Sequence, residues 1–175
     1  MMVSERIQQY ENFMSGIPIK ISAPILLDMG FFTAPASTKY HGAYSGGLFD
    51  HSLETAKALV ELTQKLDLKW ERPESPYIVG MYHDLCKCNL YKLDVETKNY
   101  IYNPDIIIPG HGEKSIIMIQ HFTLLTDEEI ASIRWHMGAF DDSKNWDYYG
   151  RAIEQYPNVL YTHTADMISS RIIGI

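Results

Sequence analysis

Apolar positions between residues 47 and 66 recur at three- and four-residue steps among polar ones, which is the pattern of an amphipathic helix. The pattern predicts a helix of about five turns over residues 47–66, with His51 in its first turn. Residues 76–85 are mostly apolar and follow Ser75, an expected N-cap, with proline next. They predict a second helix, mostly buried, that runs up to the dipeptide of His83 and Asp84.

The segment between residues 89 and 109 has a different pattern. Aromatic and β-branched residues in YKLDV and NYIYN flank the polar ETK, and this arrangement predicts a small β-hairpin around residues 90–103. A further helix is predicted to begin near His111, which lies between two glycines. Helices therefore dominate the chain, and the predicted fold class is all-α.

Two more helices are expected in the last third of the chain. Thr126 and Glu129 form the signature of a capping box, which predicts a helix over residues 127–136 that ends at His136. Pro157 opens a final helix that carries His163 and Asp166. His163 is expected to support the site or the core, and His121, with no partner in the pattern, to be structural.

Length and composition limit the class of protein. The chain has 175 residues, of which 46% are hydrophobic, and this size suits one domain with one substantial core. It contains no apolar run of about 18 residues and begins without the order of a secretion signal. We therefore expect a soluble cytoplasmic protein with no membrane partner.

The charge and the cysteines narrow the choice of partners. A formal net charge of −7 without a basic stripe makes long nucleic acid an unlikely partner and favours a small ligand. Cys86 and Cys88, the two cysteines, are too close for an easy disulfide and too few for a cysteine zinc site. We expect both to be reduced thiols. The oligomeric state is left open.

Histidines are the candidate chemistry of this chain. A single buried histidine is usually a hydrogen-bonded structural residue. Here, however, five of the seven lie at or beside predicted helix ends or in glycine-rich turns: His41, His51, His83, His111 and His136. His51, the pair of His83 and Asp84, His111, His136 and Asp166 follow one another on five different predicted elements, which favours a common site.

These residues lie in HGAYSGGLFDHSLETAKAL, YHDLCK, GHGEKS, IRWHMG and HTADMISS. The ordered set resembles the HD-domain superfamily of metal-dependent phosphohydrolases, although no single motif is specific. The resemblance implies one HD domain over residues 1–175, an all-α helical bundle. A helical extension would cover about residues 1–40, and a metal-binding core about residues 41–175.

The resemblance also implies a ligand set. His51, His83, Asp84 and Asp166 match the shared metal ligands of the family, and His111 and His136 match the additional histidines of its two-metal members. Cys86 departs from the pattern, because glycine is usual there, whereas Lys87 follows it. Imidazole and carboxylate ligands suit Mn, Fe, Ni, Co or Zn, and we expect two divalent transition-metal ions.

The dipeptide of His83 and Asp84 fits this chemistry. Neighbouring side chains on a helix point about 100° apart, so both reach one ion only from a helix end. Asp84 can then place one oxygen on each of two ions that hold a hydroxide as the nucleophile. Asp84 and Lys87 are the predicted catalytic residues.

Three residues are candidates for contact with the substrate: His41, Glu113 and Lys114. The alternatives are that His41 stabilises a turn and that Glu113 and Lys114 form a solvated helix cap. Lys114 or Lys87 is expected to neutralise a phosphate oxygen.

The leading interpretation is a metal-dependent phosphohydrolase that acts on a small phosphate ester such as a nucleotide. Tyr91, Tyr100 and Tyr102 of the hairpin either cover a flat group of the substrate or pack the hairpin itself. A di-iron HD-type oxygenase of a small substrate has the same ligand set. A third interpretation is a signalling or binding module that retains a metal.

Overall fold

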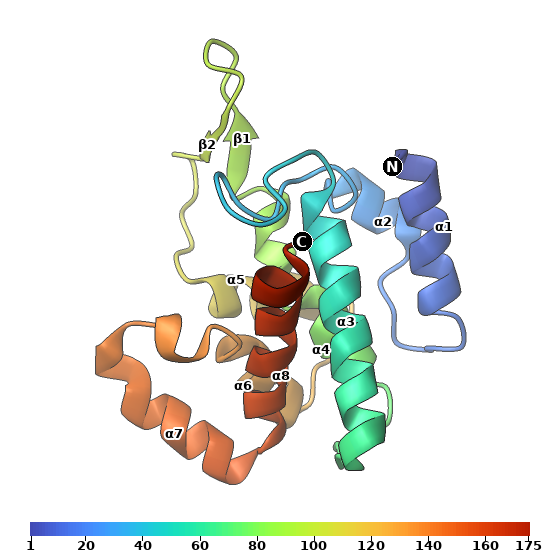
Figure 1. The fold of residues 1–175 in the computed structure, drawn as a ribbon, viewed down its shortest axis with the longest axis vertical. Coiled ribbons are helices and arrows are strands. Elements are labelled where there is room, and N and C mark those ends of the chain that lie inside the picture. Colours follow the sequence, from blue (N-terminus) through green and yellow to red (C-terminus); the bar gives the residue numbers. More distant parts are fainter.

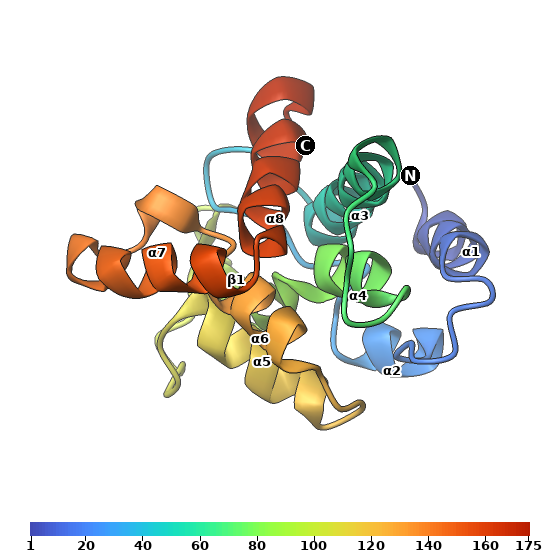
Figure 2. The same cartoon turned by 90° about the horizontal axis from the view of Figure 1, so that it is seen from below.

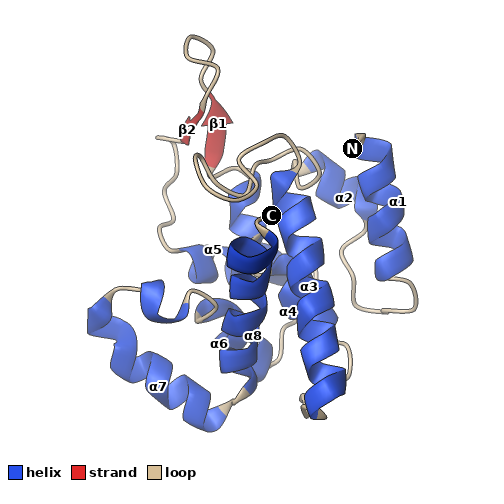
Figure 3. Ribbon diagram, in the orientation of Figure 1, coloured by secondary structure: helices blue, strands red, loops and turns tan.

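A computed structural model describes residues 1–175, and it is mostly helical with one small hairpin (Figure 3). The α-helices are α1 (Val3–Phe13), α2 (Ala23–Asp28), α3 (Gly47–Leu66), α4 (Ser75–Tyr82), α5 (His111–Gln120), α6 (Asp127–Arg134), α7 (Trp146–Gln155) and α8 (Asn158–Met167). Three short 3-10 helices are η1 (Leu85–Cys88), η2 (Gly138–Phe140) and η3 (Ser143–Asn145), and α8 continues as a π-helix, η4 (Ile168–Ile173). The predicted all-α class is confirmed.

Helix α3 is the central element of the bundle. It packs along α4 on one face and α8 on another, and α6 packs against both α5 and α8 (Figure 1). Helices α1 and α2 lie on the side of the bundle opposite α7 (Figure 2). This arrangement brings the start of α3, the end of α4 and the end of α8 toward one region.

The N-terminal helices are tied to the bundle by polar contacts within an aromatic core. The hydroxyl of Tyr10 in α1 contacts the carbonyl oxygen of Ile21 and lies 2.5 Å from the hydroxyl of Tyr82 in α4. Arg6 donates two hydrogen bonds of 2.9 Å to the carboxylate of Asp50 in the first turn of α3. These contacts fix the end of α3 that carries His51.

Helices α3 and α4 touch backbone to backbone at Gly80. A Cβ atom on Gly80 would lie 2.4 Å from the Cα atom of Ala56, so only glycine permits this approach. Since α3 carries His51 and α4 ends at His83, the contact sets the distance between the two histidines.

Several element boundaries agree with the sequence-based predictions. Helix α3 spans the predicted residues, and the capping box of α6 is confirmed by a 3.2 Å bond from the Glu129 amide to Thr126 Oγ1 and a 3.0 Å bond from the Thr126 amide to Glu129 Oε2. The hairpin is also confirmed. Strands β1 (Tyr91–Leu93) and β2 (Tyr100–Tyr102) are antiparallel, with Tyr91 opposite Tyr102.

Three details differ from the predictions. Helix α6 ends at Arg134 and not at His136, which follows in the turn. Ser75 is the first helical residue and not the N-cap, because its hydroxyl donates a 2.8 Å hydrogen bond to the buried Glu129 instead. Helix α7 was not predicted, and it contains no buried residue.

We expect Gly80→Ala to destabilise the protein by about 1–3 kcal/mol, because the added methyl group must push α3 away from α4. The matched control is Gly150→Ala on α7, where no atom lies within 4 Å of the new Cβ. This control should stabilise the protein by about 0.5–1 kcal/mol through helix propensity. Urea unfolding of both variants measures the difference in their free energies of unfolding. Equal changes in the two variants would contradict the close contact between α3 and α4.

Candidate metal centre

Helix ends position most of the candidate side chains. His83 is the C-cap of α4, and at Asp84 the backbone leaves the helix, with φ −107° and ψ 18°. His136 follows the C-terminus of α6, and His111 is the first residue of α5. The structure therefore agrees with the expectation that the histidine–aspartate dipeptide lies at a helix end, from which both side chains reach one centre.

Five side chains form what we call the inner cluster: His51, His83, Asp84, His136 and Asp166. Nε2 of His51 lies 3.2 Å from Asp166 Oδ1 and 3.7 Å from Asp84 Oδ2. Nε2 of His83 lies 3.4 Å from Asp84 Oδ2, whereas Nε2 of His136 lies 3.5 Å from Asp84 Oδ1. The two oxygens of Asp84 thus face different histidines.

The inner cluster contains polar atoms that the protein leaves unsatisfied. Nε2 of His51, His83 and His136 and Oδ1 of Asp84 are buried and have no hydrogen-bond partner. Each such atom costs about 1–3 kcal/mol unless something binds it. Several unsatisfied acceptors that converge on one point are the signature of a cation site rather than of a packed core.

The distances within the inner cluster fit a metal ion. Nitrogen and oxygen ligands lie about 2.0–2.2 Å from a divalent ion such as zinc, so neighbouring ligands of one ion are about 3.0–3.5 Å apart. The separations of 3.2, 3.4 and 3.5 Å between histidine nitrogens and carboxylate oxygens fall in this range. The residues present therefore fit a divalent metal.

The other ring nitrogen of each inner histidine is held by the backbone. Nδ1 of His83 lies 2.9 Å from the carbonyl oxygen of Gly80, and Nδ1 of His136 lies 2.7 Å from that of Ile133. Nδ1 of His51 lies 3.0 Å from the carbonyl oxygen of Ile175. Since a carbonyl only accepts, Nδ1 of His83 and of His136 carries the proton, and their Nε2 atoms present a lone pair to the cluster, whereas Nδ1 of His51 also lies 3.0 Å from the Ser169 hydroxyl, which can donate or accept.

Asp84 is ionised in this environment. Burial by itself raises the pKa of its carboxyl, but the charge of Lys87 and the nearby His83 and His136 rings outweigh burial and hold the pKa well below its usual range. Lys87 Nζ lies 2.6 Å from Asp84 Oδ2. Burial alone would lower the pKa of Lys87, yet Asp84 reverses the effect and raises it. Lys87 thus remains charged beside the cluster.

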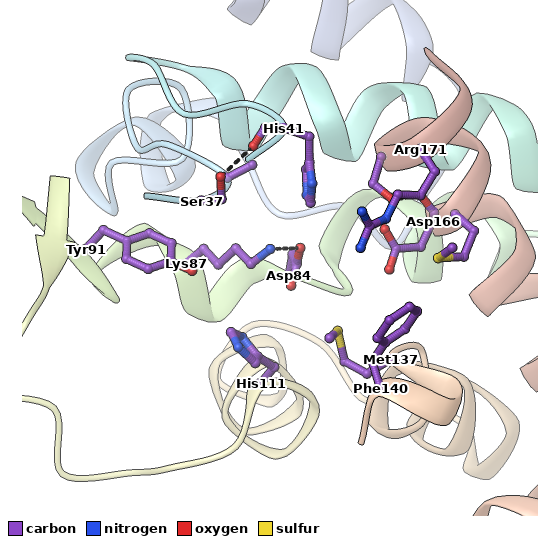
Figure 4. Close-up of a pocket in the computed structure, with 13 residues that line it drawn as sticks. Ser37, His41, Asp84, Lys87, Tyr91, His111, Met137, Phe140, Asp166 and Arg171 are labelled. Atoms are coloured by element: carbon purple, nitrogen blue, oxygen red, sulfur yellow. Dashed lines mark hydrogen bonds and ion pairs between the residues drawn. The ribbon is translucent and has the colours of Figure 1, made fainter. Parts of the chain in front are cut away.

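A cavity of about 180 Å³ lies beside the inner cluster (Figure 4). Five predicted site residues line it, namely His41, Asp84, Lys87, His111 and Asp166. The His41 ring lies 4.9 Å from that of His51, and burial is the main cause that lowers the pKa of His41 to about 4, with smaller contributions from the neighbouring His51 and Lys87. His41 is therefore neutral at physiological pH and faces the cavity.

The sequence-based reasoning missed several residues of this cavity: Ser37, Met137, Phe140, Ser170 and Arg171. Arg171 is the most important of them, because its guanidinium is a second cationic group at the cavity (Figure 4). It follows Asp166 by five residues on the π-helical stretch η4. No motif in the sequence marked it.

Two of the three predicted substrate contacts, Glu113 and Lys114, have partners within the protein. Lys114 is buried and its ammonium group is 2.5 Å from Asn89 Oδ1, while Glu113 forms a 2.7 Å ion pair with Arg134. Neither residue lines this cavity, but Glu113 lines a second cavity of about 400 Å³ that adjoins it. A contact of either residue with a substrate stays a prediction. His163 supports the cluster as expected, since its Nδ1 lies 2.7 Å from the His136 carbonyl oxygen.

The fold and the site together define a class: a helical protein with histidines and aspartates from helix ends gathered in a buried cluster that can hold divalent metal. The family model for the HD domain matches residues 48–170, and the chain belongs to this family. Searches of curated proteins and of solved structures returned no match. No helix combines the length and the apolar character needed to cross a membrane.

We expect divalent metal to stabilise the fold by satisfying the inner cluster. At a metal concentration a hundredfold above Kd, binding raises the free energy of unfolding by about 2.7 kcal/mol. This increase corresponds to a rise in Tm of roughly 5–10 °C. Differential scanning fluorimetry with Mn²⁺, Co²⁺, Ni²⁺ and Zn²⁺ measures it against protein treated with a chelator.

His83→Ala should abolish most of this metal-induced shift. The control is His121→Ala, since His121 is exposed and lies outside the cluster. If no metal raised Tm, or if both variants kept the full shift, the cluster would not be the metal site.

Proposed function

We propose that the protein is a metal-dependent phosphohydrolase that acts on a small phosphate ester such as a nucleotide. The observation that carries the proposal is the juxtaposition of the unsatisfied inner cluster and a cavity with cationic side chains. Metal at the cluster and cations beside it are the two features that hydrolysis of a phosphate ester needs. Membership of the HD-domain family supports the same reaction class.

Divalent metal at the cluster would supply a water of lowered pKa as the nucleophile and would stabilise charge on the phosphate. His51, His83 and Asp166 would hold one ion, and His136 and His111 would hold a second. Asp84 would belong to both subsites, because its Oδ2 faces His51 and His83 while its Oδ1 faces His136. This division of the Asp84 carboxylate supports two ions rather than one.

Three side chains at the cavity are suited to the substrate. Lys87 and Arg171 provide positive charge, and Arg171 can bind two phosphate oxygens at once through its planar fork. His41 is neutral and can donate or accept a hydrogen bond without adding charge. Together they would orient the phosphate toward the inner cluster and offset the negative charge of Asp84 and Asp166.

The size and charge of the site favour a small substrate. A second cavity of about 400 Å³ adjoins the first and shares His111, Met137 and Phe140 with it, which leaves room for the group esterified to the phosphate. Tyr91 lines the first cavity and also packs on Tyr102, with ring centroids 5.2 Å apart. The net charge of −7 opposes a long polyanion.

The test is phosphate release by metal-free protein reloaded with Mn²⁺, Co²⁺ or Ni²⁺ under nitrogen. We expect hydrolysis of nucleoside monophosphates and of p-nitrophenyl phosphate without oxygen, because hydrolysis needs no oxidant. We also expect a higher kcat/KM on a mononucleotide than on long single-stranded RNA at the same salt concentration.

Three outcomes would contradict the proposal. Strict dependence on iron together with oxygen would favour an oxygenase, and tight metal binding without turnover would favour a binding module. A higher kcat/KM on long RNA would refute the small substrate while leaving the reaction class in place.

Asp84→Ala should reduce kcat more than Lys87→Ala does. Loss of Lys87 removes one electrostatic contact, and the loss of one such contact typically lowers kcat by about 10²–10³-fold. Loss of Asp84 removes the carboxylate shared by both subsites. The control is Lys65→Ala at the far end of α3, where the lysine side chain is 69% exposed. Steady-state kinetics at equal metal content decide the order, and equal or reversed losses would contradict these roles.

A further inference from the structure

Cys86 lies two residues after Asp84, on the short helix η1, and its side chain is only 1% exposed. Its thiol is not part of a disulfide. His111 lies within hydrogen-bond distance of the sulfur, with its Nδ1 3.6 Å from Cys86 Sγ. The proposed reaction assigns no role to this buried thiol.

The sulfur has the position of a third ligand beside Asp84 and His111. A carboxylate oxygen of Asp84, Cys86 Sγ and a ring nitrogen of His111 all lie within 4.8 Å of one another. In a tetrahedral zinc site with Zn–S of about 2.3 Å and Zn–N of about 2.0–2.1 Å, sulfur and nitrogen are about 3.6 Å apart. The observed separation of 3.6 Å equals that value.

A second observation, independent of the cysteine, points to a ligand here. Asp84 is 2% exposed, and its Oδ1 has no hydrogen-bond partner, although Lys87 satisfies Oδ2. Oδ1 also faces His136, whose Nε2 is likewise buried and unsatisfied. The side of Asp84 that faces away from Lys87 therefore needs a cation that no protein group provides.

The backbone holds the three side chains together. The amide of Cys86 donates a 3.1 Å hydrogen bond to Ser115 Oγ, and Ser115 belongs to the same helix, α5, that begins with His111. This bond joins η1 to α5, so Cys86 and His111 keep their relative position. Figure 4 shows Asp84 and Lys87 above His111, the first residue of α5.

We propose that Cys86 Sγ is a metal ligand, which together with Asp84 and His111 forms a mixed sulfur, oxygen and nitrogen subsite for the second ion. This inference rests on the proposed function, because it deepens the same centre. The soft thiolate makes the subsite prefer Zn²⁺ or Co²⁺ to Mn²⁺ or Mg²⁺. Coordination releases the thiol proton to solvent.

The experiment is cobalt titration of the full chain under nitrogen, followed by absorption spectroscopy. We expect about two Co²⁺ per chain and a sulfur-to-cobalt charge-transfer band in the near ultraviolet that grows with the second ion. Cys86→Ser should lose the band and weaken binding of the second ion by at least about 10-fold, while the first ion still binds. Cys88→Ser is the matched control. It should keep the charge-transfer band and the affinity for the second ion, since Cys88 packs against the hydrophobic core.

Each other outcome overturns the inference in a distinguishable way. Two bound cobalt ions without a sulfur band, or a band lost only in Cys88→Ser, would remove Cys86 from the site and leave the proposed function intact. Failure of the unaltered protein to bind cobalt, manganese or zinc would refute both proposals.

A spectroscopic measurement on the unaltered protein keeps the inference testable if Cys86→Ser does not fold. X-ray absorption of the zinc-loaded chain should show a sulfur shell at about 2.3 Å in addition to nitrogen and oxygen at about 2.0–2.1 Å. Nitrogen and oxygen shells alone would overturn the assignment of Cys86.

Discussion

The buried carboxylate of Asp84 is the constraint on which the rest of the site depends. Asp84 is 2% exposed, and burial of an unpaired carboxylate costs several kcal/mol. Lys87 neutralises one of its oxygens, while the other lies 3.5 Å from His136 Nε2 and has no hydrogen-bond partner. The fold therefore needs additional positive charge at one point, and this need is what turns a set of packed helices into a candidate metal centre.

Helix ends provide the geometry that surrounds this carboxylate. The last turn of a helix leaves carbonyl oxygens without backbone partners. His83 and His136 use such carbonyls, those of Gly80 and Ile133, to fix the ring tautomer that leaves Nε2 free. A histidine just past a helix end thus donates a hydrogen bond to a free carbonyl oxygen of the helix and leaves its Nε2 available to bind a metal. This explains why the histidines accumulate at helix ends and not at helix centres.

The features recognised from sequence are those with local causes. The bounds of α3 follow from apolar spacing, the start of α6 from its capping box, and the hairpin from aromatic and β-branched strands around a polar turn. The six proposed ligands were recognisable from their order along the chain. The partners of Lys114 and Glu113, which are Asn89 and Arg134, were not predicted, because adjacency to His111 in sequence does not determine which way a helical side chain turns.

The sequence by itself determined the fold class and the elements with strong periodicity, because each is encoded within a few turns, and the order of the histidines and aspartates along the chain indicated the candidate ligands. Only the tertiary structure decided which groups share the centre. Arg171 lies five residues after Asp166, about 140° away on an ordinary α-helix, and the wider π-helical stretch η4 brings it to the same cavity. Likewise, Cys86 meets His111 only because η1 packs on α5, and packing between distant segments leaves no periodic signal in the chain.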